Sequence, residues 1–309
     1  MLRPAASIFL KPRSNSSPIM PTFTLLTFNC LGLPRVDTRR RLLSLARELE
    51  RAPYDAVCLQ EVQAVSSRNL LIQDCASYAS AYAPNVYGAR GGLLTLARRP
   101  MTAVQYTAYR ERGHWSSPAI MDWPLQKGVL CTVLALEDLA VVVLNTHLNP
   151  NYRGSWSSDN HYARTQVAQL RQLAEIAGAQ PATALVVAAG DFNIPRGSWL
   201  YDEFLALSGL DDPLAGDLRP TYRPPPIIPK RYALALDFVL MRAPRLPGLQ
   251  VQADIRFSEQ LPLIGGGLGY LSDHYAVELR VSWAARGSEG AAIDQRGEAP
   301  QDQRQTGGD

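Results

Sequence analysis

The chain has 309 residues, of which 46% are hydrophobic and 19% are charged, and this balance excludes a wholly disordered or fibrous protein. Its apolar runs are shorter than the roughly 18 residues that a transmembrane helix needs, so no membrane span is predicted. The net charge of +3, from 31 Lys and Arg against 28 Asp and Glu, is too small to indicate polyanion binding or steering toward a membrane.

The N-terminus and the cysteines bear on the cellular compartment. Residues 1–21 are predicted to be a disordered arm, and their apolar stretch from Ala5 to Leu10 is shorter than the about 7–15 residues of a secretory signal. The four cysteines show no C-x-x-C spacing and three lie in or beside apolar runs, which favours reduced core thiols over zinc ligands or disulfides. We therefore expect a cytoplasmic protein, with secretion left open.

The predicted folded domain spans residues 22–283, and a polar tail at 284–309 is predicted to be disordered. Two runs, 22–29 and 56–60, are apolar or β-branched and predict buried strands, and Thr38 is placed to cap the amphipathic helix between them. The other predicted strands are 92–98, 103–109, 128–136, 139–146, 184–190, 234–241, 250–256 and 275–283.

Two further helices are predicted in the second half of the chain. One spans about 160–177, with Asp159 placed to cap its start and Gly178 suited to its end, and a shorter one lies near 198–207. The proline-rich segment 219–232 predicts a rigid loop. Because many neighbouring strands are close in sequence, the pattern favours an α/β sandwich with mixed sheets inside and helices outside.

Polar side chains follow or interrupt the apolar strands at six places. They are Asn29, Glu61, His147, Asp191 with Asn193, Asp237, and Asp273 with His274. Strand ends let a rigid sheet project side chains into a common cleft. Carboxylates buried together repel one another, and a divalent cation removes that cost. Oxygen donors favour Mg²⁺ or Mn²⁺, and a histidine beside a carboxylate can serve as a general base.

Each of these residues also has a purely structural interpretation. Asn29 could form a turn, Glu61 could cap a helix, His147 could be a hydrogen-bonded core histidine, and the GDFN segment could build an Asx-turn. Asp237 is harder to explain in this way, because an unpaired carboxylate inside an apolar run is costly. The recurrence of such residues along the chain favours a functional site.

Six short motifs occur in a defined order. They are TFNCLGLP (27–34), LQEV (59–62), NTHL (145–148), GDFN (190–193), LDFVL (236–240) and SDH (272–274). Together, over about residues 22–283, they resemble the endonuclease/exonuclease/phosphatase superfamily, which is also called DNase-I-like. The resemblance implies a four-layer α/β/β/α sandwich with two mixed, mainly antiparallel sheets, and Mg²⁺-dependent cleavage of phosphate esters, with Mn²⁺ as a second candidate ion.

Within the superfamily, the N-C-x-G-L-P form of the first motif and the QKG at 126–128 are most similar to neutral sphingomyelinase-like phosphodiesterases. Leu31 departs from that pattern, because a Trp often stands there, and the membrane helices of the animal enzymes do not follow the domain. The resemblance therefore implies a phospholipid phosphodiesterase acting at a membrane surface, which we expect to be a monomer.

The resemblance also implies a role for each motif residue. Glu61 would be the principal metal ligand, with Asn29 and Asp273 on the metal side. His274 would take the proton of an attacking water, oriented by Asp237. The remaining residues would orient the water or the leaving group (Asp191), bind phosphate oxygens (His147 and Asn193) or add positive charge (Lys127).

Substrate choice in such enzymes lies in loops, and three loops here carry aromatic or apolar residues. We predict that Tyr152 and Trp156 contact substrate, and that Trp115, Trp123 and the segment 261–271 complete a lipid-facing rim. The alternative is that these side chains pack over the ends of the sandwich.

Two other functions stay open at this point. A nuclease could neutralise DNA or RNA phosphates with the arginines of the loops, namely Arg110, Arg112, Arg153 and Arg196. A non-catalytic binding protein could retain the same fold, but it would have no need for both a metal ligand and a His–Asp pair.

Overall fold

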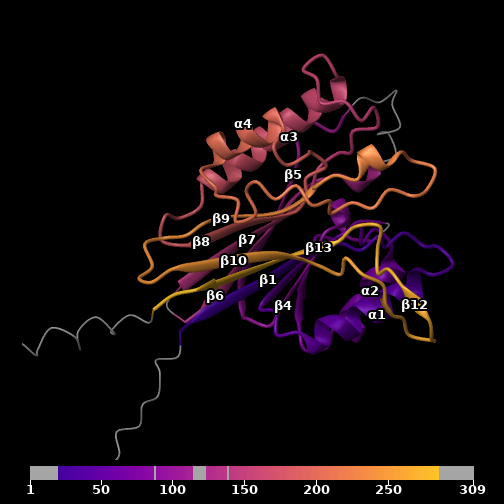
Figure 1. Cartoon of the computed structure of the whole chain (residues 1–309). Coiled ribbons are helices and arrows are strands. Elements are labelled where there is room, and N and C mark those ends of the chain that lie inside the picture. The colour runs from indigo at the N-terminus through magenta and orange to yellow at the C-terminus, as the bar shows by residue number, and fades with distance from the viewer. Residues whose placement is uncertain (1–19, 87, 114–122, 138, 285–309) are drawn as a thin grey trace, which may run out of the picture.

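The computed structural model describes residues 20–86, 88–113, 123–137 and 139–284. Two β-sheets pack face to face, and helices cover the outer face of each sheet (Figure 1). This arrangement is the predicted four-layer α/β/β/α sandwich. The predicted arm falls almost wholly in residues 1–19 and the predicted tail in 285–309, and both lie outside the described residues.

Each sheet contains one parallel pair of strands, and its other pairs are antiparallel. The first sheet has the order β10-β13-β1-β2-β4-β3, with β1 and β2 parallel, and the second has the order β5-β6-β7-β8-β9, with β7 and β8 parallel. The strands of the first sheet are β10 (Gln250–Arg256), β13 (Ala276–Ser282), β1 (Thr22–Asn29), β2 (Ala56–Gln60), β4 (Leu94–Ala97) and β3 (Ala79–Ala81). Those of the second sheet are β5 (Met101–Ala108), β6 (Gly128–Leu136), β7 (Leu139–His147), β8 (Leu185–Asp191) and β9 (Asp237–Arg242). A separate hairpin pairs β11 (Leu261–Pro262) with β12 (Leu268–Gly269).

The helices divide between the two outer faces. α1 (Thr38–Arg51) and α2 (Val65–Asp74) pack on the first sheet, and α3 (His161–Gly178) and α4 (Trp199–Ser208) pack on the second. Two short 3₁₀ turns are η1 (Arg90–Gly92) and η3 (Lys230–Tyr232). Helix α2 was not predicted, because few of its residues are buried and its apolar side chains do not line one face. No helix of the described part of the chain is both long and apolar enough to cross a bilayer.

The helix ends differ from the predictions in three details. Thr38 is the first residue of α1 rather than its cap, and its hydroxyl donates to the carbonyl of Leu33. The cap of α3 is Asn160, whose side chain accepts from the Tyr162 N–H at 3.1 Å, because the Asp159 carboxylate already accepts from Ser157. Gly178 is the last residue of α3 and not the residue that follows it.

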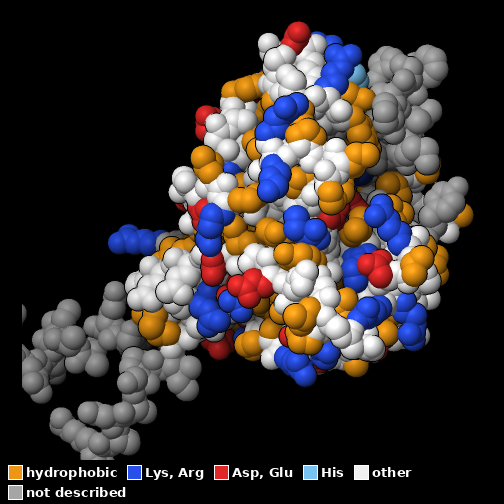
Figure 2. Space-filling view, turned by 45° about the vertical axis from the view of Figure 1, so that its right-hand side comes forward, with side chains coloured by type: hydrophobic (Ala, Val, Ile, Leu, Met, Phe, Trp, Pro, Cys, Tyr) orange, Lys and Arg blue, Asp and Glu red, His pale blue; other side chains and the backbone are white. Residues whose placement is uncertain are grey.

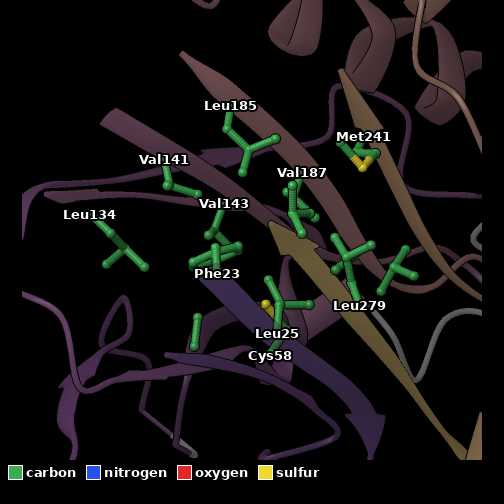
Figure 3. Close-up of a cluster of buried hydrophobic side chains, with 14 of the residues drawn as sticks. Phe23, Leu25, Cys58, Leu134, Val141, Val143, Leu185, Val187, Met241 and Leu279 are labelled. Carbon is green, nitrogen blue, oxygen red and sulfur yellow. The ribbon is translucent and has the colours of Figure 1, made fainter. Parts of the chain in front are cut away.

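The strand alternation that builds the core also aims side chains into one end of it. In β1, Phe23 and Leu25 enter the cluster between the sheets, and Asn29 follows on the same face with period two. In β7, Val143 enters the same cluster and His147 follows. Figure 3 shows these apolar side chains converging between the two sheets. The polar residues at the strand ends therefore continue the inner face of the sandwich instead of facing solvent.

Candidate active site

The strand topology brings the six predicted polar positions to one end of the molecule. β1, β2, β7 and β8 end there, since each parallel pair points the same way. β9 and β13 begin there, because β9 is antiparallel to β8 and β13 is antiparallel to β1. This end lies on the right-hand side of Figure 1. The site is thus assembled from both sheets.

Asn29 connects the carboxylates of the two sheets. Its amide nitrogen donates to Glu61 Oε1 at 3.2 Å and to Asp191 Oδ2 at 3.0 Å. Its amide oxygen accepts from the Leu31 N–H at 3.2 Å, so the direction of the amide is set by the backbone. In this orientation Asn29 holds the two carboxylates together, and its oxygen would face a cation only after the amide turned.

Two histidines face the same carboxylate oxygen. Asp191 Oδ2 lies 3.5 Å from His147 Nε2 and 3.7 Å from His274 Nε2. The other ring nitrogen of His274, Nδ1, lies 2.9 Å from Asp237 Oδ2, so Asp237 fixes the orientation of this imidazole. All four of these side chains are buried. The predicted His274–Asp237 pair is therefore present in the structure, next to Asp191.

The surroundings shift the pKa values of the two histidines in opposite directions. Burial disfavours the charged form of His274, but Asp237 and Asp191 outweigh it and raise its pKa to about 10. Burial, with Lys127 and His274 adding to it, holds the pKa of His147 well below its usual value. Without a cation His274 is thus the charged imidazole at neutral pH, and His147 is neutral.

The carboxyl groups next to these histidines have raised pKa values. Burial raises the pKa of Asp191 to about 7, against the opposing effect of His274. Burial also raises the pKa of Glu61, and the neighbouring Asp273 raises it further. Clustered carboxyl groups with raised pKa values are typical of a cation-binding or catalytic site.

Glu61 and Asn193 follow the ends of β2 and β8, and both have a left-handed backbone conformation. Their φ angles are 62° and 52°, values that residues other than glycine seldom adopt. The Asn193 N–H donates to Asp191 Oδ1 at 3.0 Å, and its side-chain amide donates to the Leu148 carbonyl at 3.1 Å. The Nζ of Lys127 reaches the same carbonyl at 2.9 Å. Asn193 and Lys127 therefore lie together beside the end of β7.

The predicted substrate residues fall into different environments. Tyr152 is half exposed and meets Tyr162 edge to face at 5.7 Å, and Trp123 is 41% exposed. Trp156, which was predicted to contact substrate, has a side chain partly buried against the cluster between the second sheet and α3 and α4. Trp115 lies outside the described residues.

The sequence interpretation missed a buried polar layer beneath the site. Gln60 Nε2 donates to Asn145 Oδ1 at 2.9 Å, which joins the two sheets directly, and it also donates to Thr27 Oγ1 at 3.0 Å. The Asn145 amide in turn reaches Thr95 Oγ1 at 3.3 Å. Period-two alternation in AVCLQ and VVVLNTH places Gln60 and Asn145 on the inner face, and that signal could have found them.

Two further residues next to the His274–Asp237 pair were also missed. The Tyr222 ring lies 5.0 Å from the His274 imidazole, centroid to centroid. The hydroxyl of Thr221 accepts from the Asp237 N–H at 3.0 Å, which anchors the start of β9. Both belong to the proline-rich segment, so this loop forms one wall of the site.

The donors fit a hard divalent cation. Asp191, Asp237 and His274 offer ligand atoms within 4.8 Å of one another. Asp237 Oδ2 is already hydrogen-bonded to His274, however, so a cation between those two groups would displace that bond. Glu61 and Asp273 offer further carboxylate oxygens near Asp191, and Asn29 would add an oxygen only after its amide turned; the charge of His274 acts on Glu61 as well. Oxygen-rich donors of this kind suit Mg²⁺ or Mn²⁺ better than zinc.

Comparisons with known proteins agree with this geometry. Residues 26–274 match the model of the Endonuclease/Exonuclease/phosphatase family. The chain is 30% identical over 200 residues to the "Putative neutral sphingomyelinase" of Drosophila melanogaster, which covers 62% of this chain and 44% of that relative. The chain thus spans less than half the length of this curated relative.

Two solved structures show the same fold. One is a beta toxin from Staphylococcus aureus with bound magnesium ions, with a TM-score of 0.65, 15% identity, and coverage of 85% of this chain and 99% of the other. The second is TDP2 from D. rerio complexed with a single-strand DNA product, with a TM-score of 0.63, 17% identity, and coverage of 84% and 98%. The chain belongs to the endonuclease/exonuclease/phosphatase family, and it has a DNase-I-like fold.

Proposed function

We propose that the protein is a Mg²⁺-dependent phosphodiesterase that hydrolyses a sphingomyelin-like phospholipid by attack of water on phosphorus. The observation that carries this proposal is the site itself. The 2.9 Å His274–Asp237 pair and the Asn29–Glu61 pair both lie next to Oδ2 of Asp191. An acid–base group and an oxygen-rich cation site thus meet at the same carboxylate.

The protein groups divide the chemistry between them. His274 Nε2 accepts a proton from the attacking water while Asp237 steadies the ring, and the new P–O bond forms as the bond to the leaving alcohol breaks. His147 and Asn193 donate hydrogen bonds to the non-bridging phosphate oxygens, where negative charge accumulates. Asp191 orients the water or the leaving group. In this scheme no covalent enzyme intermediate forms.

The cation site supports Mg²⁺ as the cofactor. Glu61 would be its principal protein ligand, with Asn29 and Asp273 beside it, and the magnesium bound to the similar beta toxin supports the choice of ion. Bound there, Mg²⁺ would act as a Lewis acid toward the leaving oxygen. A cation there would offset the charges of Asp191 and Asp273, two of the causes of the raised pKa of His274, and so would favour the neutral imidazole that can act as a base, although Asp237, the largest of these causes, remains.

The lipid substrate is supported by the relative and by exposed apolar side chains. Four such residues are Trp123, Tyr152, Ile227 (91% exposed) and, in the β11–β12 hairpin, Leu268 (65% exposed). Figure 2 turns the end that holds the site toward the viewer and shows small groups of hydrophobic side chains among Lys and Arg. A face of this composition suits the boundary between headgroups and acyl chains of a bilayer.

A nuclease remains the second candidate, because the TDP2 structure with a DNA product shares the fold. The structure removes part of the predicted basic surface, however. The Arg196 side chain is 1% exposed and forms a 2.7 Å ion pair with Asp212, so it cannot reach a nucleic acid backbone. Arg110, by contrast, stays 78% exposed in its 3.3 Å pair with Glu175 of α3. We therefore rank the nuclease below the lipid phosphodiesterase.

An activity panel with Mg²⁺ tests the proposal. Purified protein is compared on sphingomyelin vesicles, phosphatidylcholine vesicles, inositol phosphates, plasmid DNA and an abasic duplex, with His274→Ala as the inactive control. We expect release of phosphocholine from sphingomyelin and a loss of at least about 10²-fold in the variant. Nicked plasmid without phosphocholine release would instead establish the nuclease.

A further inference from the structure

Arg41 is a buried arginine of α1 that contacts two loops of the site without reaching the site itself. Its side chain is 5% exposed. Nη1 donates to the carbonyls of Cys30 at 3.1 Å and Leu271 at 2.7 Å, and Nη2 donates to the carbonyl of Leu31 at 2.8 Å. Cys30 and Leu31 directly follow Asn29, and Leu271 precedes His274 by three residues. One guanidinium thus joins two segments that lie far from each other along the chain, and Leu271 itself is 230 residues from Arg41.

We propose that Arg41 is a positioning residue that holds the Asn29 loop and the His274 loop at a fixed separation. This inference rests on the proposed function of the site. The planar guanidinium presents several N–H groups in a rigid fork, so it can bond carbonyls of both loops at once. Nη1 alone bonds the carbonyls of Cys30 and Leu271, so a lysine would lack the second nitrogen, Nη2, that bonds the Leu31 carbonyl.

The first loop shows why such a clamp is needed. Leu31 has a φ of 47°, in the left-handed region that a leucine adopts only when its surroundings hold it there. Its carbonyl accepts from Arg41, and its N–H donates to Asn29 Oδ1. The same residue therefore links Arg41 to the amide that bridges Glu61 and Asp191. If Leu31 relaxed, the Asn29 amide would lose its fixed direction.

The second loop connects Arg41 to His274. The Leu271 carbonyl accepts the shortest Arg41 bond, and the adjacent Ser272 hydroxyl accepts from the His274 N–H at 3.2 Å. The only acidic partner that the structure shows for the described Arg41 side chain is Asp37, which is 60% exposed and 3.3 Å away. The buried charge is thus satisfied mainly by loop carbonyls, which favours a role in holding backbone rather than in a salt bridge.

Two neighbouring arginines provide matched controls. Arg40 Nε donates to the Ile264 carbonyl at 2.9 Å, and Arg47 donates to the Pro262 carbonyl. Both bonds join the same helix to the β11–β12 hairpin, but they are exposed and end farther from His274 in sequence. Loss of either bond should leave the two loops of the site in place.

The test compares Arg41→Lys, Arg41→Ala and Arg40→Lys on a soluble phosphodiester, bis(p-nitrophenyl) phosphate, with Mg²⁺. We expect Arg41→Lys to lower kcat about tenfold and Arg41→Ala about 100-fold, the scale of a misplaced reacting group, with KM within about threefold. Added guanidinium ion should restore Arg41→Ala by about tenfold, and Arg40→Lys should match the wild type. Arg41 variants that match Arg40→Lys, or an Arg41→Ala variant that guanidinium does not restore, would overturn the inference.

A measurement without turnover separates this inference from the proposed function. The proton between His274 Nδ1 and Asp237 gives an NMR signal that a His274→Gln variant identifies among the four histidines of the chain. We expect this signal to shift or broaden in Arg41→Lys and to stay unchanged in Arg40→Lys. An inactive wild type with that NMR response would refute the proposed substrate class but keep the clamp. An active wild type with an unchanged signal in Arg41→Lys would refute the clamp alone.

Discussion

Asp237→Asn should weaken the fold and change how its stability depends on pH. The variant keeps the shape of the side chain but removes the charge 2.9 Å from His274 Nδ1. The pKa of His274 is raised from 6.5 to about 10, so its stabilising effect is complete below pH 6.5 and is lost as the pH rises through 10. At about 1.4 kcal/mol per pKa unit, the upper bound is about 5 kcal/mol. Because Asp191 supplies part of this effect and remains, we expect a loss of about 2 to 3 kcal/mol, the range of a charge-assisted hydrogen bond.

Urea unfolding in the presence of EDTA measures this directly. The free energy of unfolding of the wild type should fall between pH 6.5 and 9, and Asp237→Asn should start lower and fall less. Asp254→Asn is the control, because that carboxylate is exposed, pairs with the exposed Arg219 and otherwise accepts a local bond from the Ile255 N–H. If Asp237→Asn kept the stability of the wild type at pH 6.5, or the same decline with pH, the reasoning about this pair would be refuted.

Three further changes have expected outcomes. Gly190→Ala should lower the free energy of unfolding in urea by more than about 3 kcal/mol, because a Cβ at Gly190, whose φ is 152°, would overlap the Thr146 carbonyl. An unchanged unfolding midpoint would contradict the close approach of β7 and β8 at this point. Gln60→Ala should cost about 2 to 3 kcal/mol by leaving Asn145 Oδ1 without this buried donor, and a neutral effect would show that the two sheets do not depend on that bond. Mg²⁺ at about 100 times its Kd should stabilise the wild type by about 2.7 kcal/mol in thermal unfolding, while Glu61→Gln should lose most of this gain; an equal gain in both would place the ion elsewhere.

The parts of the site that the sequence could predict are those set by strand ends. Asn29, Glu61, His147 and Asp191 each end or follow an apolar run, and parallel pairing brings such ends together. The same pattern singled out Asp237 and His274, whose strands begin at that edge, and the family motifs added the role expected of the pair. Local pattern and topology were sufficient for these residues.

Other features depend on contacts that no local pattern contains. Arg41 looks like one of several arginines at the start of α1, and only the folded chain shows it against Leu271. Arg196 has the sequence context of a surface cation, yet it pairs with Asp212 inside the fold. The exposure of a charged or aromatic side chain is a tertiary property, so the sequence left open whether Trp156 contacts substrate or packs, and in the structure it lies partly buried.

The position of the bound cation tests the central claim most directly. Crystals grown with Mn²⁺, whose anomalous scattering locates the ion, would show which carboxylates hold it. The account predicts one ion within about 2.2 Å of a Glu61 carboxylate oxygen, the usual length of such a bond, with the His274–Asp237 hydrogen bond intact. An ion seated between Asp237 and His274, with Glu61 outside its coordination sphere, would contradict the assignment of metal and acid–base roles.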